Sequence, residues 1–184
     1  MPEVTTRDGD GRWTAARLLE VDQRNVIEVL ASTVLFHGLP EVELRKVAGI
    51  VSERSCPAGH HVFLTGDIAT EFFVVATGAV RVVIPTADDQ LDVAIVRPGE
   101  VFGEGAMLDG GPRVASAYSL EPTTLLAIRR TEWLDLIDRD VVIPRRVFAA
   151  LGASMRRYVQ HTVDSLFLDV DIPDYPADEA GSGL

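Results

Sequence analysis

The stretch Val101–Ala117, VFGEGAMLDGGPRVASA, decides how the rest of the chain is interpreted. Glycines flank Glu104, and Arg113 follows nine residues later, after the turn-forming run Asp109-Gly110-Gly111-Pro112. A glycine-acid pair that closes a strand and enters a short helix predicts outward-pointing backbone N–H groups, which can cradle an anion. A guanidinium binds phosphate bidentately, and a carboxylate accepts hydrogen bonds from hydroxyls. We therefore predict a ribose phosphate site, with Glu104 on the sugar and Arg113 on the phosphate.

Three short segments of this stretch resemble a known family. Phe102-Gly103-Glu104, Ala106-Met107-Leu108 and Pro112-Arg113-Val114-Ala115 resemble the phosphate-binding cassette of the cyclic nucleotide-binding domains. That superfamily includes the regulatory subunits of cAMP-dependent protein kinase and the Crp/Fnr bacterial regulators. The resemblance implies that Glu104 takes the ribose 2′-hydroxyl and Arg113 the cyclic phosphate. It also implies backbone contacts from Gly103, Gly105, Ala106, Val114 and Ala115.

Short apolar segments alternate with glycine or proline turns from about Ser52 to Ile128. We predict strands at 53–56, 61–64, 71–76, 79–84, 91–96 and, interrupted near Pro122, 116–128. Many short strands at near-regular spacing predict an all-β barrel or roll. The glycines at 59, 66, 78, 99 and 103 are explained by turns that need positive φ. Their placement follows the β-roll of the cyclic nucleotide-binding domains, so the resemblance extends over residues 34–165.

Helices are predicted on both sides of this β region. Apolar periodicity indicates one or two helices between Trp13 and Leu30, with Asp22 as a candidate N-cap. Another helix opens at Pro40, with an apolar face made of Val42, Leu44, Val47, Ala48, Ile50 and Val51. A short helix is predicted at 131–138 and a long one from Asp140, its N-cap, to Leu166. The fold class is therefore mainly β with flanking helices: a jelly-roll-like β-roll (double-stranded β-helix) with N-terminal helices and a long C-terminal helix.

The predicted organisation is a flexible lead at residues 1–12, one domain at 13–168 and an acidic tail at 169–184. The point where the tail begins resembles the exit of Crp-type regulators from their long helix into a winged helix-turn-helix. Here an acidic segment containing Gly and Pro follows, and such a segment cannot bury a core. We therefore expect a sensor domain without the DNA-reading domain.

The long helix carries an apolar stripe at Val147, Leu151, Met155, Val159 and Leu166, widened by Phe148, Tyr158 and Val163. In Crp/Fnr regulators the corresponding helix forms the dimer interface and lies over the ligand, which implies a homodimer through residues 140–166. A helix that simply covers the roll explains the stripe equally well. Tyr158 and Val159 stand where Crp has a Thr-Ser pair that holds the adenine. Tyr158 either stacks on the base or belongs to the dimer face or the core.

Val114 bears on the identity of the nucleotide. Family members that prefer cGMP often carry a threonine directly after the arginine, and its hydroxyl meets the guanine 2-amino group. Valine has that shape without the hydroxyl, so the resemblance implies cAMP as the ligand and disfavours cGMP. The alternative is that Val114 is only a strand residue.

Composition excludes several other classes of function. A net charge of −11 argues against nucleic-acid binding, so no DNA partner is expected. A single cysteine, Cys56, excludes an intramolecular disulfide and is expected to be a buried small hydrophobe. Neither a basic leader nor a membrane-length apolar run is present, which predicts a cytoplasmic protein without membrane contact. The four histidines form no metal-ligand pattern, and no catalytic motif is visible, so no metal and no enzyme activity are expected.

The leading hypothesis is a non-enzymatic cAMP sensor that repositions its C-terminal helix and signals within a homodimer or to a protein partner of unknown identity. The main alternative is an interaction module that keeps the fold without the ligand. It is motivated by the missing Thr-Ser pair and by Gly105, where the family usually has Leu or Ile, a departure that predicts a looser cassette. A local alternative is that Glu104 and Arg113 form an internal salt bridge that holds a turn.

Overall fold

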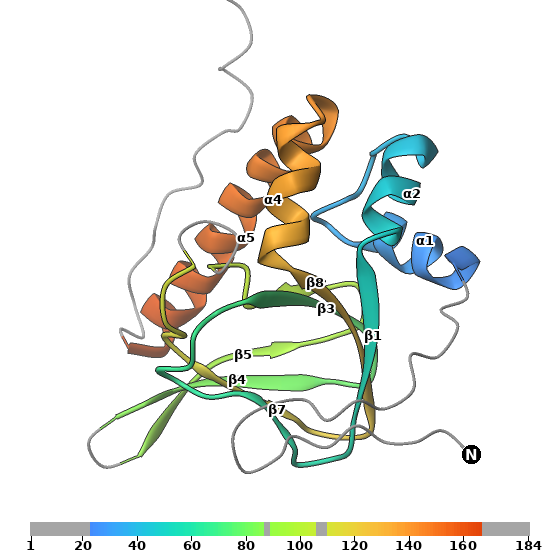
Figure 1. The fold of residues 1–184 in the computed structure, drawn as a ribbon. Coiled ribbons are helices and arrows are strands. Elements are labelled where there is room, and N and C mark those ends of the chain that lie inside the picture. Colours follow the sequence, from blue (N-terminus) through green and yellow to red (C-terminus); the bar gives the residue numbers. More distant parts are fainter. Residues whose placement is uncertain (1–22, 87–88, 106–109, 167–184) are drawn as a thin grey trace, which may run out of the picture.

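The described part of the chain is a β-roll with its helices gathered on one side (Figure 1). The structure is a computed structural model, and it describes residues 23–86, 89–105 and 110–166. The predicted lead at 1–12, the tail at 169–184, Asp22 and the predicted helical residues 13–22 lie outside these ranges.

Two four-stranded antiparallel sheets form the roll. One sheet has the strand order β1-β8-β3-β6 and the other β2-β7-β4-β5. The strands are β1 (Val51–Cys56), β2 (His61–Phe63), β3 (Glu71–Thr77), β4 (Val80–Pro85), β5 (Gln90–Val96), β6 (Val101–Phe102), β7 (Ser116–Ser119) and β8 (Thr123–Arg129). The predicted β fold and all of its strand segments are confirmed, with ends shifted by one or two residues. The five glycines predicted to have positive φ all have it.

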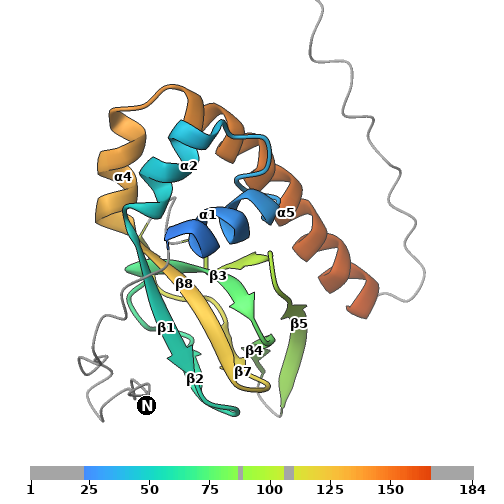
Figure 2. The same ribbon diagram turned by 90° about the vertical axis from the view of Figure 1, so that its right-hand side faces the viewer.

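The helices are α1 (Gln23–Ser32), α2 (Glu41–Ala48), α4 (Arg130–Asp138) and α5 (Val142–Leu166). Pro40 is the N-cap of α2, as predicted. The Asp140 carboxylate accepts hydrogen bonds from the backbone N–H groups of Val142 and Ile143 at 2.9 and 3.1 Å, which confirms its capping role for α5. Figure 2 shows α5 running from the other helices down along the edge of β5.

The apolar face predicted for α2 was wrong at two positions. Val42 is 63% exposed, because two residues along a helix place a side chain nearly opposite Leu44, which is buried. Val51 belongs to β1 instead of the helical stripe.

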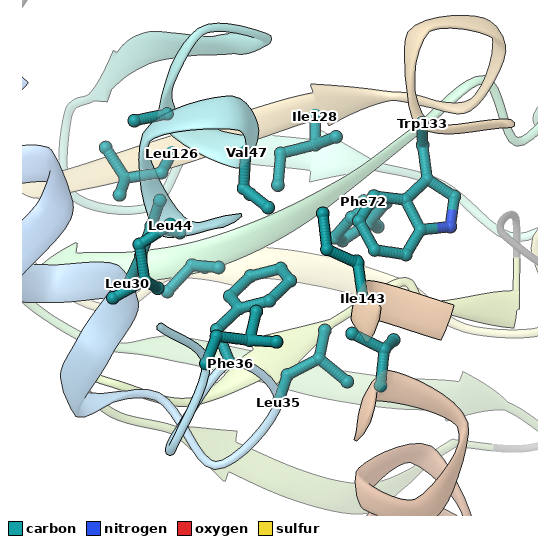
Figure 3. Close-up of a cluster of buried hydrophobic side chains, with 14 of the residues drawn as sticks. Leu30, Leu35, Phe36, Leu44, Val47, Phe72, Leu126, Ile128, Trp133 and Ile143 are labelled. Carbon is teal, nitrogen blue, oxygen red and sulfur yellow. The ribbon is translucent and has the colours of Figure 1, made fainter. Parts of the chain in front are cut away.

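The core divides between the two faces of β3. Phe72 and Val74 face the helices and pack in a cluster with residues such as Phe36, Trp133 and Ile143 (Figure 3). Phe73 and Val75 point into the roll and join the second cluster. Strand β3 is therefore buried on both faces, which explains its continuous apolar sequence Phe-Phe-Val-Val. The candidate site is built beside the start of this strand.

Candidate functional site

A pocket of about 600 Å³ lies between the Val101–Ala117 cassette, the sheet β2-β7-β4-β5 and α5. At one end it is lined by two charged residues, Glu104 and Arg113, with cassette backbone around them. At the other end the lining is apolar and comes from three elements: Val82 and Ile84 on β4, Val93 on β5, and Met155 and Val159 on α5. The described lining is thus suited to a ligand with one anionic, hydroxylated end and one flat apolar end.

Arg113 is only 8% exposed, and contacts on several sides fix its side chain. Its Nη1 donates to the carbonyl oxygen of Gly103 at 2.8 Å, and its Nη2 donates to the carbonyl oxygen of Glu71. The guanidinium carbon lies 4.0 Å from the centre of the Phe63 ring, within cation–π distance. The backbone N–H of Arg113 donates to the carbonyl of Asp67 at 2.8 Å, which anchors the returning arm of the cassette to the β2–β3 loop.

The Arg113 guanidinium, which lines the pocket, retains unused donor capacity. Its buried Nε has no hydrogen-bond partner among the described residues. Burial lowers the pKa of Arg113 to about 10, and the nearby carboxylates of Glu71, Asp67 and Glu104 act in the opposite direction. Since this value lies about three units above neutral pH, Arg113 is a permanent cation under ordinary conditions. A buried cation with an unused donor is a binding point for an anion.

Glu104 sits at the junction of the pocket and the helices. It is 6% exposed, and besides the pocket it borders a small hollow lined by Leu35 and by Leu151 of α5. Its position depends on Gly103, which has a φ of +71°. A Cβ atom at residue 103 would lie 2.7 Å from Nη1 of Arg113, so the close approach of arginine and backbone also requires glycine.

Six of the eight predicted site residues line this one pocket: Gly103, Glu104, Gly105, Arg113, Val114 and Ala115. Ala106 lies outside the described residues, and so does the side chain of Tyr158, whose backbone belongs to α5. The structure therefore brings together the acid, the arginine and most of the cassette backbone. Val114 is at the mouth of the pocket and largely exposed.

Sequence reasoning missed several residues that shape the site. Met155 was identified only as part of an apolar stripe, and its four-residue spacing from Val159, which the resemblance placed at the position of the Crp pair, was the available signal that the two share one face. Two other residues contact the Arg113 guanidinium: Phe63 through its ring and Glu71 through its carbonyl oxygen. No sequence pattern indicated that either would lie at the site. They come from β2 and β3, some 50 and 42 residues before Arg113, and only the folded sheets bring them together.

The other predicted features of the chain lie away from this pocket. Cys56 is buried, as predicted, and burial raises the pKa of its thiol to about 11, so it remains a neutral, apolar group. Within the described ranges, no group of three or more His, Cys, Asp or Glu side chains is placed to hold a metal ion. None of the helices in those ranges is long and apolar enough to cross a membrane.

Comparison with known proteins gives a consistent result. Residues 53–140 match the family described as the cyclic nucleotide-binding domain. The chain is 36% identical over 123 residues to the cyclic AMP receptor protein of Thermus thermophilus, covering 66% of this chain and 57% of that protein. It is 26% identical over 130 residues to the cAMP-dependent protein kinase regulatory subunit of Yarrowia lipolytica, covering 70% of this chain and 34% of that protein. It thus spans about half or less of the length of these relatives.

The fold comparison agrees with the sequence comparison. The crystal structure of the Thermus thermophilus catabolite activator protein superposes with a TM-score of 0.63 at 34% identity, covering 74% of this chain and 62% of that one. Both relatives are regulatory proteins by name, one a receptor and one a kinase regulatory subunit. The two-sheet roll, the cassette with its acid and arginine, and these similarities lead to one assignment: residues 53–140 belong to the cyclic nucleotide-binding domain superfamily, and the chain is similar to Crp/Fnr-type regulators.

Proposed function

We propose that this domain is a non-catalytic sensor that binds cAMP reversibly in the pocket between the cassette and α5. The observation that carries the proposal is the pairing of Glu104 and Arg113. Both side chains are more than nine-tenths buried, and both line a pocket whose remaining described side chains are apolar. A ribose phosphate would place its anion beside the Arg113 cation and its 2′-hydroxyl beside the Glu104 carboxylate, which accepts hydrogen bonds.

In the proposed complex the cyclic phosphate meets the Nε side of Arg113 and the backbone N–H groups of the cassette. The ribose 2′-hydroxyl donates to Glu104, and the purine lies against Val82, Val93 and the α5 residues. Each charge-assisted hydrogen bond contributes about 1.5–3 kcal/mol. Three or four of them, reduced by the entropy cost of binding, correspond to micromolar affinity, about −8 kcal/mol.

The preference for cAMP over cGMP is proposed from Val114 and from the relatives. Val114 lines the mouth of the pocket and has no hydroxyl with which to meet a guanine 2-amino group. The Thermus thermophilus relative is named a cyclic AMP receptor, which points in the same direction. We expect cGMP to bind more weakly than cAMP.

The signal is proposed to travel through α5, because Met155 and Val159 belong to both the helix and the pocket wall. A ligand that contacts them stabilises one helix position by its differential affinity. Phe148, Met155 and Val159 are also substantially exposed, and they offer an apolar stripe to a second copy of the helix or to a partner protein. We propose a homodimer through residues 140–166 as the simplest receiver, and a protein of unknown identity as the alternative one.

Calorimetric titration with cAMP and cGMP tests the proposal. We expect the wild type to bind cAMP with micromolar affinity, and Arg113→Ala to weaken binding at least about 100-fold, since it removes two charge-assisted hydrogen bonds. Arg81→Ala is the matched control, because Arg81 pairs with Asp92 on the exposed surface. A folded wild type that binds neither nucleotide contradicts the proposal, and so does an Arg113→Ala variant with unchanged affinity.

A second candidate function is an interaction module that has lost the ligand. The observation that favours it is Gly105: no heavy atom of the residues that the structure describes lies within 4 Å of the position that its Cβ would occupy. The cassette therefore has open space where the family usually packs an apolar side chain. A melting temperature that does not rise on addition of either nucleotide, in a protein whose α5 face still dimerises or binds a partner, supports this second function over the first.

A further inference from the structure

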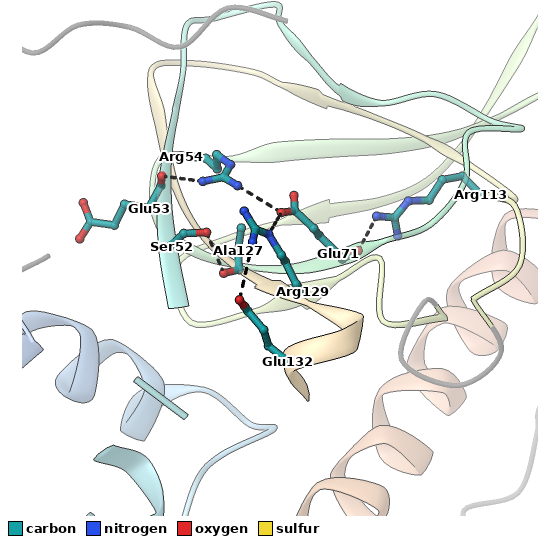
Figure 4. Close-up of polar contacts among 8 residues, drawn as sticks. All are labelled: Ser52, Glu53, Arg54, Glu71, Arg113, Ala127, Arg129 and Glu132. Carbon is teal, nitrogen blue, oxygen red and sulfur yellow. Dashed lines mark hydrogen bonds and ion pairs between the residues drawn. The ribbon is translucent and has the colours of Figure 1, made fainter. Parts of the chain in front are cut away.

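Glu71 contacts Arg113, the residue proposed to bind the phosphate, and is not among the described residues that line the pocket. It is the first residue of β3, pairs in register with Arg129 on β8, and is 9% exposed. Its main chain and its side chain point to different partners (Figure 4). The carbonyl oxygen accepts a hydrogen bond from Nη2 of Arg113.

The Glu71 carboxylate is held between two further arginines. Its Oε1 lies 3.1 Å from Nη2 of Arg54 and 3.7 Å from Nε of Arg129. Arg54 is largely buried like Glu71, whereas Arg129 is more exposed and reaches on to Glu132 of α4 at 3.6 Å. Figure 4 shows this series of charged side chains running from β1 through Glu71 to the start of α4.

This arrangement acts on Arg113 in two ways. The β3–β8 ladder and the two arginine contacts hold Glu71 at both its backbone and its side chain, so the carbonyl that Arg113 uses is fixed in direction. Two donors of Arg113 are thereby committed to backbone oxygens, and Nε has no hydrogen-bond partner among the described residues. In addition, the negative charge of Glu71 offsets part of the cost of burying the Arg113 cation.

We propose that Glu71, anchored by Arg54 and Arg129, is a positioning residue that orients Arg113 for the phosphate and thereby sets the affinity of the pocket. The inference rests on the proposed function, since it assumes that Arg113 binds an anion. Buried ion pairs are weak sources of net stability, and a role in orienting a neighbouring group is a physical reason for such a pair at this place.

The test compares Glu71→Gln with a double variant, Glu71→Gln/Arg54→Met. The single change keeps the shape of Glu71 but leaves the buried Arg54 cation without its partner, so we expect both a lower melting temperature and about tenfold weaker cAMP binding. The double variant also removes the Arg54 cation, which the single change leaves without an ion-pair partner. We expect the melting temperature to recover while the affinity stays about tenfold low, because the ion pairs that hold Glu71, and with it the carbonyl that orients Arg113, are still missing.

Two further measurements separate positioning from general stability. Glu132→Gln changes the exposed end of the same series and is expected to alter affinity by less than about twofold. The NMR signal of the Arg113 Nε–H group, identified by its loss in Arg113→Lys, is expected to shift in both Glu71 variants without ligand and to stay in place in Glu132→Gln.

If both the affinity and the melting temperature recover in the double variant, the proposal is overturned. The role of Glu71 would then be only to neutralise the buried Arg54 cation. If the wild type binds no cyclic nucleotide, the proposed function fails, and the Arg113 signal still decides the positioning role. An unshifted signal in Glu71→Gln overturns it.

Discussion

The two ends of the pocket are built on different principles. At the charged end, Arg113 is held by carbonyls from two segments and by the Phe63 ring, beside a strand buried on both faces. At the apolar end, Met155 and Val159 are 41% and 59% exposed, on a helix whose outer face lacks a covering layer among the described residues. In the proposed function, the strongest interactions lie beside a strand that is buried on both faces, and the contact proposed to respond to the ligand lies on the partly exposed helix α5. We therefore expect changes at the charged end to affect affinity most.

Gly103→Ala is expected to have the largest effect, because it disturbs the charged end twice. The residue has a φ of +71°, and a Cβ would lie 2.7 Å from Nη1 of Arg113. We expect cAMP affinity to fall by about 30-fold or more, on the order of 2 kcal/mol, with a lower melting temperature. Gly59→Ala is the matched control: its φ is +74°, but no heavy atom in the described part of the chain lies within 4 Å of the added Cβ. It should lower the melting temperature and leave affinity unchanged; equal affinity losses would show that turn strain alone is responsible.

The charge of Arg113 gives the second prediction, a loss of binding at alkaline pH. The pKa of Arg113 in the free protein is lowered by burial to about 10, and only the protonated guanidinium attracts a phosphate. A bound anion favours the protonated form of Arg113. The affinity is therefore at its full value below the free-protein pKa and is lost as the pH rises through that pKa. Calorimetry should therefore give constant affinity from about pH 6 to 9 and about tenfold weaker binding by pH 11. Circular dichroism at each pH checks that the chain stays folded, and a loss centred near pH 8 would implicate a different group.

Met155→Ala should have the smallest effect of the three, because it acts at the apolar, partly exposed end. Truncation removes apolar contact with a bound purine, which corresponds to about 1 kcal/mol or a fivefold loss of affinity. Phe148→Ala is the control on the same helix, since Phe148 is also exposed but does not line the pocket. Equal losses in both variants would assign the effect to the stability of α5 and not to ligand contact.

Several features could be predicted from the sequence because they depend on residues close together in the chain. Turn glycines such as Gly78 and Gly99 and the strands between them follow from local conformational preferences. The capping of α5 by Asp140 is likewise a matter of neighbouring backbone groups. The predicted face of α2 failed at Val42, because a short helix with several apolar residues does not show by itself which of them meets the core.

The sequence alone determined that an acid and an arginine lie in one glycine-rich cassette, since glycine geometry and residue chemistry operate within that one segment. Only the tertiary structure decided what stands around it. Phe63 lies beneath Arg113, Glu71 behind it, and Met155 across the pocket. These residues meet because two sheets close on each other and α5 folds back over the roll. Such contacts join residues about 40 to 50 positions apart, and they arise from packing that no local pattern encodes.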